Sequence, residues 1–105
     1  MTKLDHEIAA QLKARLSTAA RLVDFRVFGS RARGDADEYS DLDVFIEVES
    51  LDKTVEDAIQ QIAWEVGIEH LIHISPLVFT RHEIEETPLR SSFIVQNIAE
   101  EGVEV

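Results

Sequence analysis

Apolar residues at regular intervals predict a helix at the start of the chain and two strands after it. In residues 3–20 apolar side chains recur at every fourth position and form one stripe of a helix, which Thr2 and Asp5 can cap at its start. Residues 22–28 are rich in β-branched and aromatic types, which is typical of a strand. Residues 41–49 alternate between an aliphatic face and a largely acidic one, and this period of two indicates a second strand.

The second half of the chain predicts another helix and a third strand. Residues 55–66 place apolar side chains at helical spacing, and Gly67 is expected to end this helix. Residues 71–79 have the composition of a strand, which we expect to be broken near Pro76.

The end of the chain predicts a last helix and completes the fold class. Thr87 can cap this helix, Pro88 suits its first position, and Gly102 is its expected stop. Its inward side chains are expected to be Leu89, Phe93, Ile94 and Ile98. The order is then α-β-β-α-β-α, and we expect an α+β fold, a small mixed β-sheet with helices packed on one face.

Length, composition and charge limit what such a fold can do. A chain of 105 residues has the usual size of one domain, so we expect a single domain over residues 1–105. No apolar run approaches the roughly 20 residues that cross a bilayer, and the chain has neither a secretory signal nor a cysteine, so we expect a cytoplasmic protein. The 21 acidic and 10 basic residues give a net charge of −11, which disfavours broad nucleic-acid binding and favours a basic protein partner or metal ions.

The segment between the first two strands carries the groups of a phosphate-binding turn. Gly29 allows main-chain N–H groups to approach a bound group closely, and Ser30 adds a hydroxyl donor. A short helical turn that begins there would present the positive end of its peptide dipoles to a phosphate. Arg31 and Arg33 can add charged contacts to the same polyphosphate, although loop arginines are also commonly just solvated.

Two carboxylates follow this turn and suggest a metal site. Asp41 and Asp43 are two positions apart on a strand, so they project from the same face. They repel each other unless a cation lies between them, and Mg²⁺ commonly takes one or two carboxylates together with substrate phosphates and waters. The pattern therefore favours Mg²⁺ bridged to a nucleoside triphosphate, although polar residues on the solvent face of a one-sided sheet would show the same alternation.

The spacing of these residues resembles the signature of a known superfamily. Gly29-Ser30, ten intervening residues and Asp41-x-Asp43 on an apolar strand are similar to the motif of the DNA polymerase β-like nucleotidyltransferases, and the short chain looks like the minimal nucleotidyltransferases among them. The resemblance implies that Gly29 and Ser30 bind the triphosphate of ATP, while Asp41 and Asp43 are catalytic and ligate Mg²⁺. It also implies an antitoxin in a hetero-oligomer with a HEPN-type RNase toxin, which it silences by transferring AMP to a tyrosine.

One position departs from this resemblance and leaves two functions open. Active members usually carry a third carboxylate on the next core strand, where this chain has His73, with Glu69 just before the strand. Imidazole can ligate a metal or take a proton, but Mg²⁺ prefers oxygen, and a histidine on a core strand can also be a hydrogen-bonded structural residue. We therefore expect either a transferase that moves AMP from ATP to a hydroxyl of a partner protein, or a degenerate antitoxin or nucleotide-binding subunit that neutralises its partner by binding alone.

Trp64 is the remaining candidate for partner contact. It lies in the second long helix but off the main apolar stripe. It is either a boundary residue of the core or an anchor for a partner surface, because half-exposed tryptophans are enriched at the centres of protein contacts.

Overall fold

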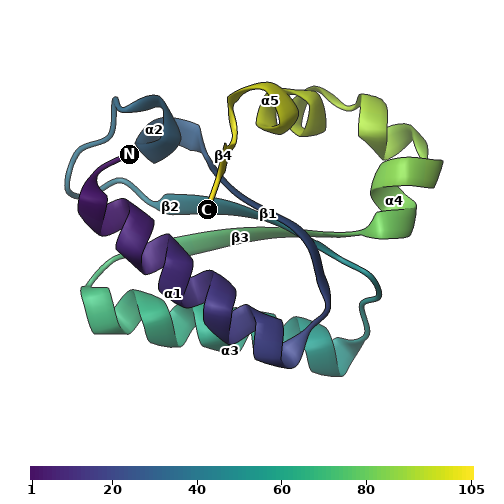
Figure 1. The fold of residues 1–105 in the computed structure, drawn as a ribbon, viewed down its shortest axis with the longest axis horizontal. Coiled ribbons are helices and arrows are strands. Elements are labelled where there is room, and N and C mark those ends of the chain that lie inside the picture. Colours follow the sequence, from purple (N-terminus) through teal and green to yellow (C-terminus); the bar gives the residue numbers. More distant parts are fainter.

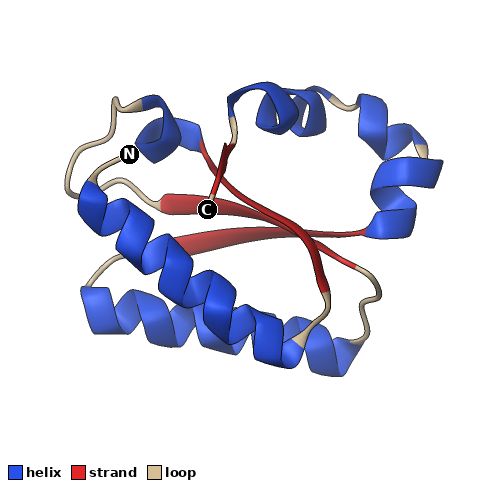
Figure 2. Ribbon diagram, viewed as in Figure 1, coloured by secondary structure: helices blue, strands red, loops and turns tan.

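A computed structural model describes residues 1–105 and shows a four-stranded sheet surrounded by helices (Figure 1, Figure 2). The first helix and the first two strands lie where the hydrophobic pattern predicts them, within one residue at each end. The elements are α1 (Lys3–Ala19), β1 (Leu22–Phe28), α2 (Gly29–Arg33), β2 (Leu42–Val48), α3 (Lys53–His70), β3 (Ile74–Thr80), α4 (Arg81–Glu86), the 3-10 helix η1 (Pro88–Ser91), α5 (Phe93–Glu101) and β4 (Val103–Glu104).

The sheet has the order β3-β2-β1-β4 and is mixed, as expected. β1 is antiparallel to both β2 and β4, whereas β2 and β3 are parallel and are connected by α3. The register places Asp43 of β2 between Phe28, the last residue of β1, and Ser75 of β3. The start of β2 therefore lies beside the turn that follows β1.

The main hydrophobic core fills the space between the sheet and the two long helices. Figure 2 shows α1 and α3 next to each other on one side of the strands. The aliphatic face predicted for β2 points into this layer and is fully buried: Leu42, Val44, Ile46 and Val48. Burial of this continuous stripe against α1 and α3 fixes the register of β2, because a shift of one residue would turn its acidic face inward. No helix in the structure has both the length and the hydrophobicity to traverse a bilayer.

The opposite face of the sheet is covered only in part. Phe45 and Glu47 are buried on this face, where the ring of Phe45 packs against Phe79 with centroids 5.9 Å apart. Burial and, after it, the nearby charge of Asp24 raise the pKa of Glu47. The short helix α5 lies on this side of the sheet and contacts β1 (Figure 1). Toward the start of β2 the cover is lost, and Asp43 remains partly exposed.

The expected helix stop at Gly67 is wrong. α3 continues to His70 and ends at Leu71, which adopts the left-handed conformation with φ 54°. Gly67 has another role, because an added Cβ would lie 2.6 Å from the carbonyl oxygen of Ile72, whose N–H donates to the carbonyl of Gly67 over 2.9 Å. Because Gly67 has no side chain, the backbone at Ile72 can lie directly against the last turn of α3.

The expected break at Pro76 is also wrong. β3 runs without interruption from Ile74 to Thr80, and Pro76 pairs in register with Val44 of β2. Because β3 is an edge strand, a residue without an N–H can be accommodated by directing its nitrogen away from β2.

The single C-terminal helix that the sequence predicts is divided in two. Ser92 caps a new helix by accepting from the N–H of Val95, so α5 starts in a phase independent of η1. Val95 and Ile98 are consequently the buried side chains of α5, whereas Phe93 is almost fully exposed and Ile94 is also exposed. The hydrophobic pattern also missed the short elements α4 and β4.

Candidate nucleotide-binding site

A tight turn joins β1 to the five-residue helix α2 and contacts β2. Gly29 begins the helix with φ 76°, a backbone conformation that disfavours side chains. An added Cβ at this position would clash with Oδ2 of Asp43 and lie 3.3 Å from its Cγ. The glycine therefore allows the backbone of the turn to lie directly against the Asp43 carboxylate, and Ser30 follows in the first turn of α2.

Asp41 and Asp43 lie close enough to repel each other. Asp41 precedes β2 and is exposed, while Asp43 is in the strand and partly buried. Burial raises the pKa of the Asp43 carboxyl, and the negative charge of Asp41 raises this pKa further. The positive charges of Arg33 and His73 act in the opposite direction. The structure thus brings two carboxylates, an arginine and a histidine to the start of β2.

His73 pairs with Asp41 instead of lying inside a core strand. Its Nδ1 is 3.3 Å from Oδ1 of Asp41, and its ring is largely exposed. The residue immediately precedes β3, where its carbonyl accepts from the N–H of Leu42 over 2.9 Å. His73 therefore lies outside the core strand, and the group beside the aspartates is an imidazole where the resemblance implies a third carboxylate.

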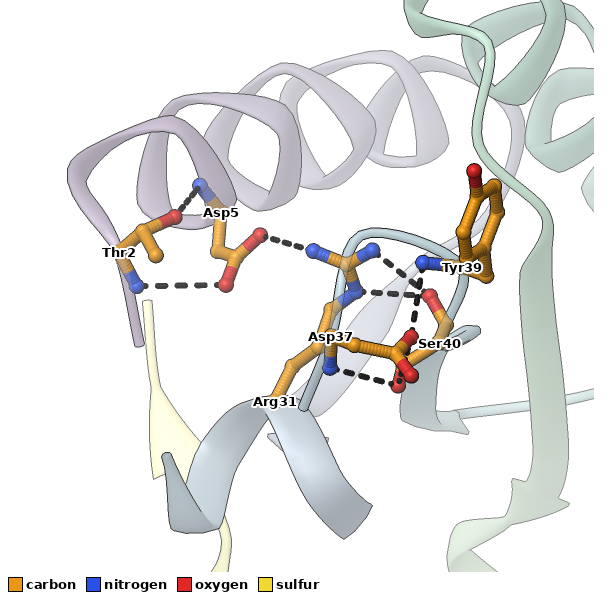
Figure 3. A network of polar contacts seen from close by, with 6 residues as sticks. All are labelled: Thr2, Asp5, Arg31, Asp37, Tyr39 and Ser40. Carbon is orange, nitrogen blue, oxygen red and sulfur yellow. Dashed lines mark hydrogen bonds and ion pairs between the residues drawn. The ribbon is translucent and has the colours of Figure 1, made fainter. Parts of the chain in front are cut away.

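Arg31 belongs to the structural frame of the site. Its Nη1 donates to Oδ1 of Asp5 over 2.8 Å, and its Nε and Nη2 both donate to the carbonyl of Ser40, over 2.9 and 2.7 Å (Figure 3). The side chains of Arg31 and Asp5 are only 11% and 4% exposed. Three N–H groups of Arg31 are thus used within this buried network, which gives the residue a structural role, and its contact with phosphate stays a prediction.

The same network reaches the loop that leads into Asp41. Asp5 also caps α1 by pairing with Thr2, so one carboxylate ties the start of α1 to α2 (Figure 3). In the loop, Oδ1 of Asp37 accepts from the N–H of Tyr39 and from the hydroxyl of Ser40. These contacts hold Ser40, and they therefore position the aspartate that follows it. The local sequence pattern indicates only a capping role for Asp5, because its partner Arg31 is 26 residues away along the chain.

Arg33 is the arginine that remains beside the carboxylates. Its side chain is about half exposed, and its only ion pair joins Nε to Oδ2 of Asp35 over 3.3 Å. Its charge nevertheless lowers the pKa of Asp43, which places it near that carboxyl. A weak, solvent-exposed pair of this kind leaves Arg33 free to exchange partners when an anion binds.

Comparisons with known proteins bear directly on this arrangement. A model of the family described as the nucleotidyltransferase domain matches residues 7–105. The chain belongs to this family. It is also 36% identical, over 102 residues, to a candidate protein adenylyltransferase of Methanocaldococcus jannaschii, and the alignment covers 94% of this chain and 96% of the relative. The predicted membership of the minimal nucleotidyltransferases is thereby confirmed, as is the α+β fold class.

The donor set of this nucleotidyltransferase domain fits a divalent ion that is shared with a substrate. Asp41 and Asp43 supply carboxylate oxygens, which Mg²⁺ prefers, and their mutual repulsion would be relieved by a cation between them. No group of three or more histidine, aspartate or glutamate side chains is arranged to hold a metal. A metal held by these two residues would therefore complete its coordination with phosphate oxygens and water.

Proposed function

We propose that this nucleotidyltransferase transfers AMP from ATP to a hydroxyl group of a partner protein. The observation that carries the proposal is the contact between Gly29 and the Asp43 carboxylate, with Asp41 beside it, in a chain of this family. The similarity to a candidate protein adenylyltransferase supports AMP as the transferred group and a protein as the acceptor. The proposed compartment is the cytoplasm, as the sequence predicts.

In this proposal the turn between β1 and α2 binds the triphosphate of ATP. The main-chain N–H groups at Gly29 and Ser30 and the Ser30 hydroxyl are the donors, since the first N–H groups of a helix have no partner within it. Arg33 adds a positive charge on the same side. Arg31 acts indirectly by holding α2 against α1 and the Ser40 carbonyl.

Asp41 and Asp43 are the residues that would hold Mg²⁺ against the phosphates. When bound, the ion would stabilise the negative charge on the attacking and leaving oxygens of the transfer. The acceptor oxygen forms a bond to the α-phosphorus of ATP, the bond from that phosphorus to the bridging oxygen breaks, and pyrophosphate and a proton are released. The two aspartates keep the α-phosphate next to the exposed start of β2, where an acceptor can approach it.

We further propose that the acceptor is a tyrosine of a HEPN-type toxin, for which this chain is the antitoxin. A net charge of −11 supports a basic protein partner, because oppositely charged surfaces attract each other and like-charged partners are disfavoured.

The exposed His73 at the position of a third carboxylate favours a second candidate function. In this alternative the protein binds nucleotide and neutralises the toxin by binding alone. It predicts that Asp43→Ala still rescues cells from the toxin and that the purified complex carries no AMP on the partner.

Transfer of label from [α-³²P]ATP to the co-purified partner tests the proposal. We expect labelling by the wild type and by Glu100→Gln, a matched control that removes an exposed carboxylate on α5. Asp41→Asn and Asp43→Asn should each reduce the initial rate by about 100-fold or more, the size of effect seen when a charge-stabilising group is lost from an active site. Unchanged labelling in both aspartate variants would contradict the proposed reaction.

A further inference from the structure

A groove of about 720 Å³ runs along α3 at the free edge of the sheet. Its walls come from α3 and from residues 71–74, which connect α3 to the start of β3. Three large apolar side chains in this groove are exposed to solvent: Trp64 by 63%, Ile68 by 56% and Leu71 by 92%. We refer to these three residues as the α3 groove patch.

The α3 groove patch lies outside the hydrophobic core of the chain. Ala63 and Ile74 also line the groove, but they are buried in the main core, whereas the patch residues lie outside that core. Contiguous apolar groups that are left in water on a small protein mark sites of interaction more often than scattered single residues do. Trp64 is moreover of the residue type most enriched at the energetic centres of protein contacts.

Leu71 gives a second, independent indication. It is the only non-glycine residue of the chain with a positive φ, at 54°, and it ends α3 in the left-handed conformation. Helices usually place glycine or asparagine there, because a side chain is strained in this conformation. Leu71 is also 92% exposed, so burial of its side chain does not offset the strain of its backbone. A contact with another molecule would supply the burial that the isolated chain does not provide.

The groove leads to the proposed transfer site. His73 lines one end of the groove, and its Nδ1 lies 3.3 Å from Oδ1 of Asp41. A side chain bound in the groove would accordingly belong to a molecule that also reaches the start of β2. The groove is thus continuous with the place where the acceptor hydroxyl has to be presented.

We infer that the α3 groove patch is the docking site for the acceptor protein. The acceptor inserts an apolar side chain against Trp64, Ile68 and Leu71 and thereby brings its hydroxyl next to Asp41. This inference rests on the proposed function, which requires a protein acceptor. It identifies the contact that selects that acceptor.

The observations favour a basic acceptor surface over the other possible occupants. A second copy of this chain would bring another net charge of −11 against the first, and the like charges would repel. Asp57 adds a carboxylate to the groove wall itself. Addition of a strand to the free edge of β3 is disfavoured by Pro76, which has no N–H to donate there. Docking therefore combines apolar contacts in the groove with attraction between a basic acceptor surface and the net negative charge of this chain.

The test compares three variants in steady-state transfer of AMP to the partner of the proposed pair. Trp64→Ser should raise the KM for the partner by about tenfold or more, as expected for truncation of a central contact residue, and change kcat by less than about twofold. Phe93→Ser is the matched control, because Phe93 is an exposed aromatic residue on α5, far along the chain from the groove, and its KM should equal that of the wild type. Leu71→Gly should raise the KM and also raise the thermal midpoint, because glycine relieves the left-handed strain at this position.

Fluorescence provides a binding readout that does not require turnover. Trp64 is the single tryptophan of the chain, so the change in emission after subtraction of the partner's own signal reports on the groove. The partner used for this measurement has its acceptor tyrosine replaced by phenylalanine, so that no transfer occurs. Addition of this partner to the wild type or to Asp43→Asn should shift the emission of Trp64 to shorter wavelength.

The outcomes separate the docking site from the reaction. An emission shift without any transfer to the unmodified partner would support the docking site and refute the proposed reaction. Transfer with the same KM in the wild type and in Trp64→Ser would overturn the docking site and leave the proposed reaction unaffected. The docking site is also overturned if emission shifts with ATP alone, which assigns the groove to the nucleotide, or with protein concentration alone, which assigns it to a second copy. Absence of both transfer and any shift refutes both proposals.

Discussion

Two charged clusters lie next to the loop between α2 and β2, and their charges are balanced in different ways. Around Arg31, the carboxylate of Asp5 and the carbonyl of Ser40 satisfy a buried guanidinium. Around Asp41 and Asp43, two like charges lie close together, and the pKa of Asp43 is raised by burial and by its neighbour. The first cluster connects α1, α2 and the loop, whereas the second is open to solvent at Asp41.

The difference between the two clusters indicates which charged residues stabilise the fold and which are available to bind a ligand. A buried ion pair with all donors satisfied contributes rigidity and is strongly disrupted when one partner is lost. Two adjacent carboxylates oppose folding unless a cation joins them, so their arrangement is better explained by a ligand than by the fold. The Arg31 cluster therefore holds the frame in which the aspartate pair is kept ready for a ligand.

The largest expected effect comes from breaking the Arg31 cluster. Arg31→Met leaves the Asp5 carboxylate buried without a charged partner and should lower the free energy of unfolding by about 3 kcal/mol or more. Arg33→Met removes only an exposed ion pair and should change the free energy of unfolding by less than about 0.5 kcal/mol. Urea denaturation of both variants measures the two changes in the free energy of unfolding. Equal losses would show that Arg31 is no more structural than Arg33.

Substitution of the two glycines at the start and end of α2 distinguishes the effect of backbone strain from the effect of damage to the site. Gly29 and Gly34 both have positive φ, 76° and 83°, so alanine at either position should destabilise the fold by about 1 kcal/mol. A Cβ at Gly34 meets no atom within 4 Å, whereas a Cβ at Gly29 displaces the Asp43 carboxylate. ATP affinity, measured by calorimetry, should therefore fall by about tenfold or more in Gly29→Ala and stay unchanged in Gly34→Ala. Similar ATP affinities in the two variants would remove Gly29 from the site.

Arg33 should affect nucleotide binding although it barely affects folding. Its charge acts on Asp43 while its own ion pair with Asp35 is weak. Arg33→Met should weaken ATP binding by about fivefold, since an exposed charged contact to phosphate contributes roughly 1 kcal/mol. Arg33→Lys keeps the charge and should retain most of the affinity. Wild-type affinity in Arg33→Met would show that the phosphates lie elsewhere.

The smallest expected effect is a pH dependence of stability. The raised pKa of Asp43 means that the folded protein holds this proton more tightly than the unfolded chain, so its contribution to stability is present below pH 4 and is lost as the pH rises through the raised pKa. The free energy of unfolding of Asp43→Asn, minus that of the wild type, should therefore increase as the pH rises above about 4.

A carboxylate with the opposite shift provides the control for this pH dependence. Hydrogen bonds from Arg15 and Gln61 lower the pKa of Glu65, so its contribution is present at neutral pH and is lost as the pH falls through the lowered pKa. The free energy of unfolding of Glu65→Gln, minus that of the wild type, should therefore decrease as the pH rises. Parallel pH profiles for the two variants would contradict the assigned environments.

The parts of this structure that could be predicted from sequence are those set by local periodicity. α1, β1 and β2 follow directly from apolar spacing, and the alternation in β2 also places Asp43 on the face opposite the core. The spacing of Gly29, Ser30 and the two aspartates is also local along the chain, and its resemblance to a family signature predicts the family that the comparisons show.

The remaining features depend on contacts between residues that are distant in the sequence. Arg31 gains its structural role only when the fold brings Asp5 to it. Gly67 resembles a helix stop, but its absent side chain is required by the returning backbone at Ile72. Ser92 restarts the last helix in a new phase, so that Phe93 turns outward. In each case a tertiary contact or a cap overrides the local pattern.

Calorimetric titration of the purified chain with ATP, with and without Mg²⁺, tests the assignment of the aspartate pair most directly. We predict saturable binding that requires Mg²⁺, is weakened by about tenfold or more in Asp41→Asn, and is unchanged in Glu100→Gln. ATP binding of equal strength in the wild type and in Asp41→Asn, or binding that is independent of Mg²⁺, would contradict the account.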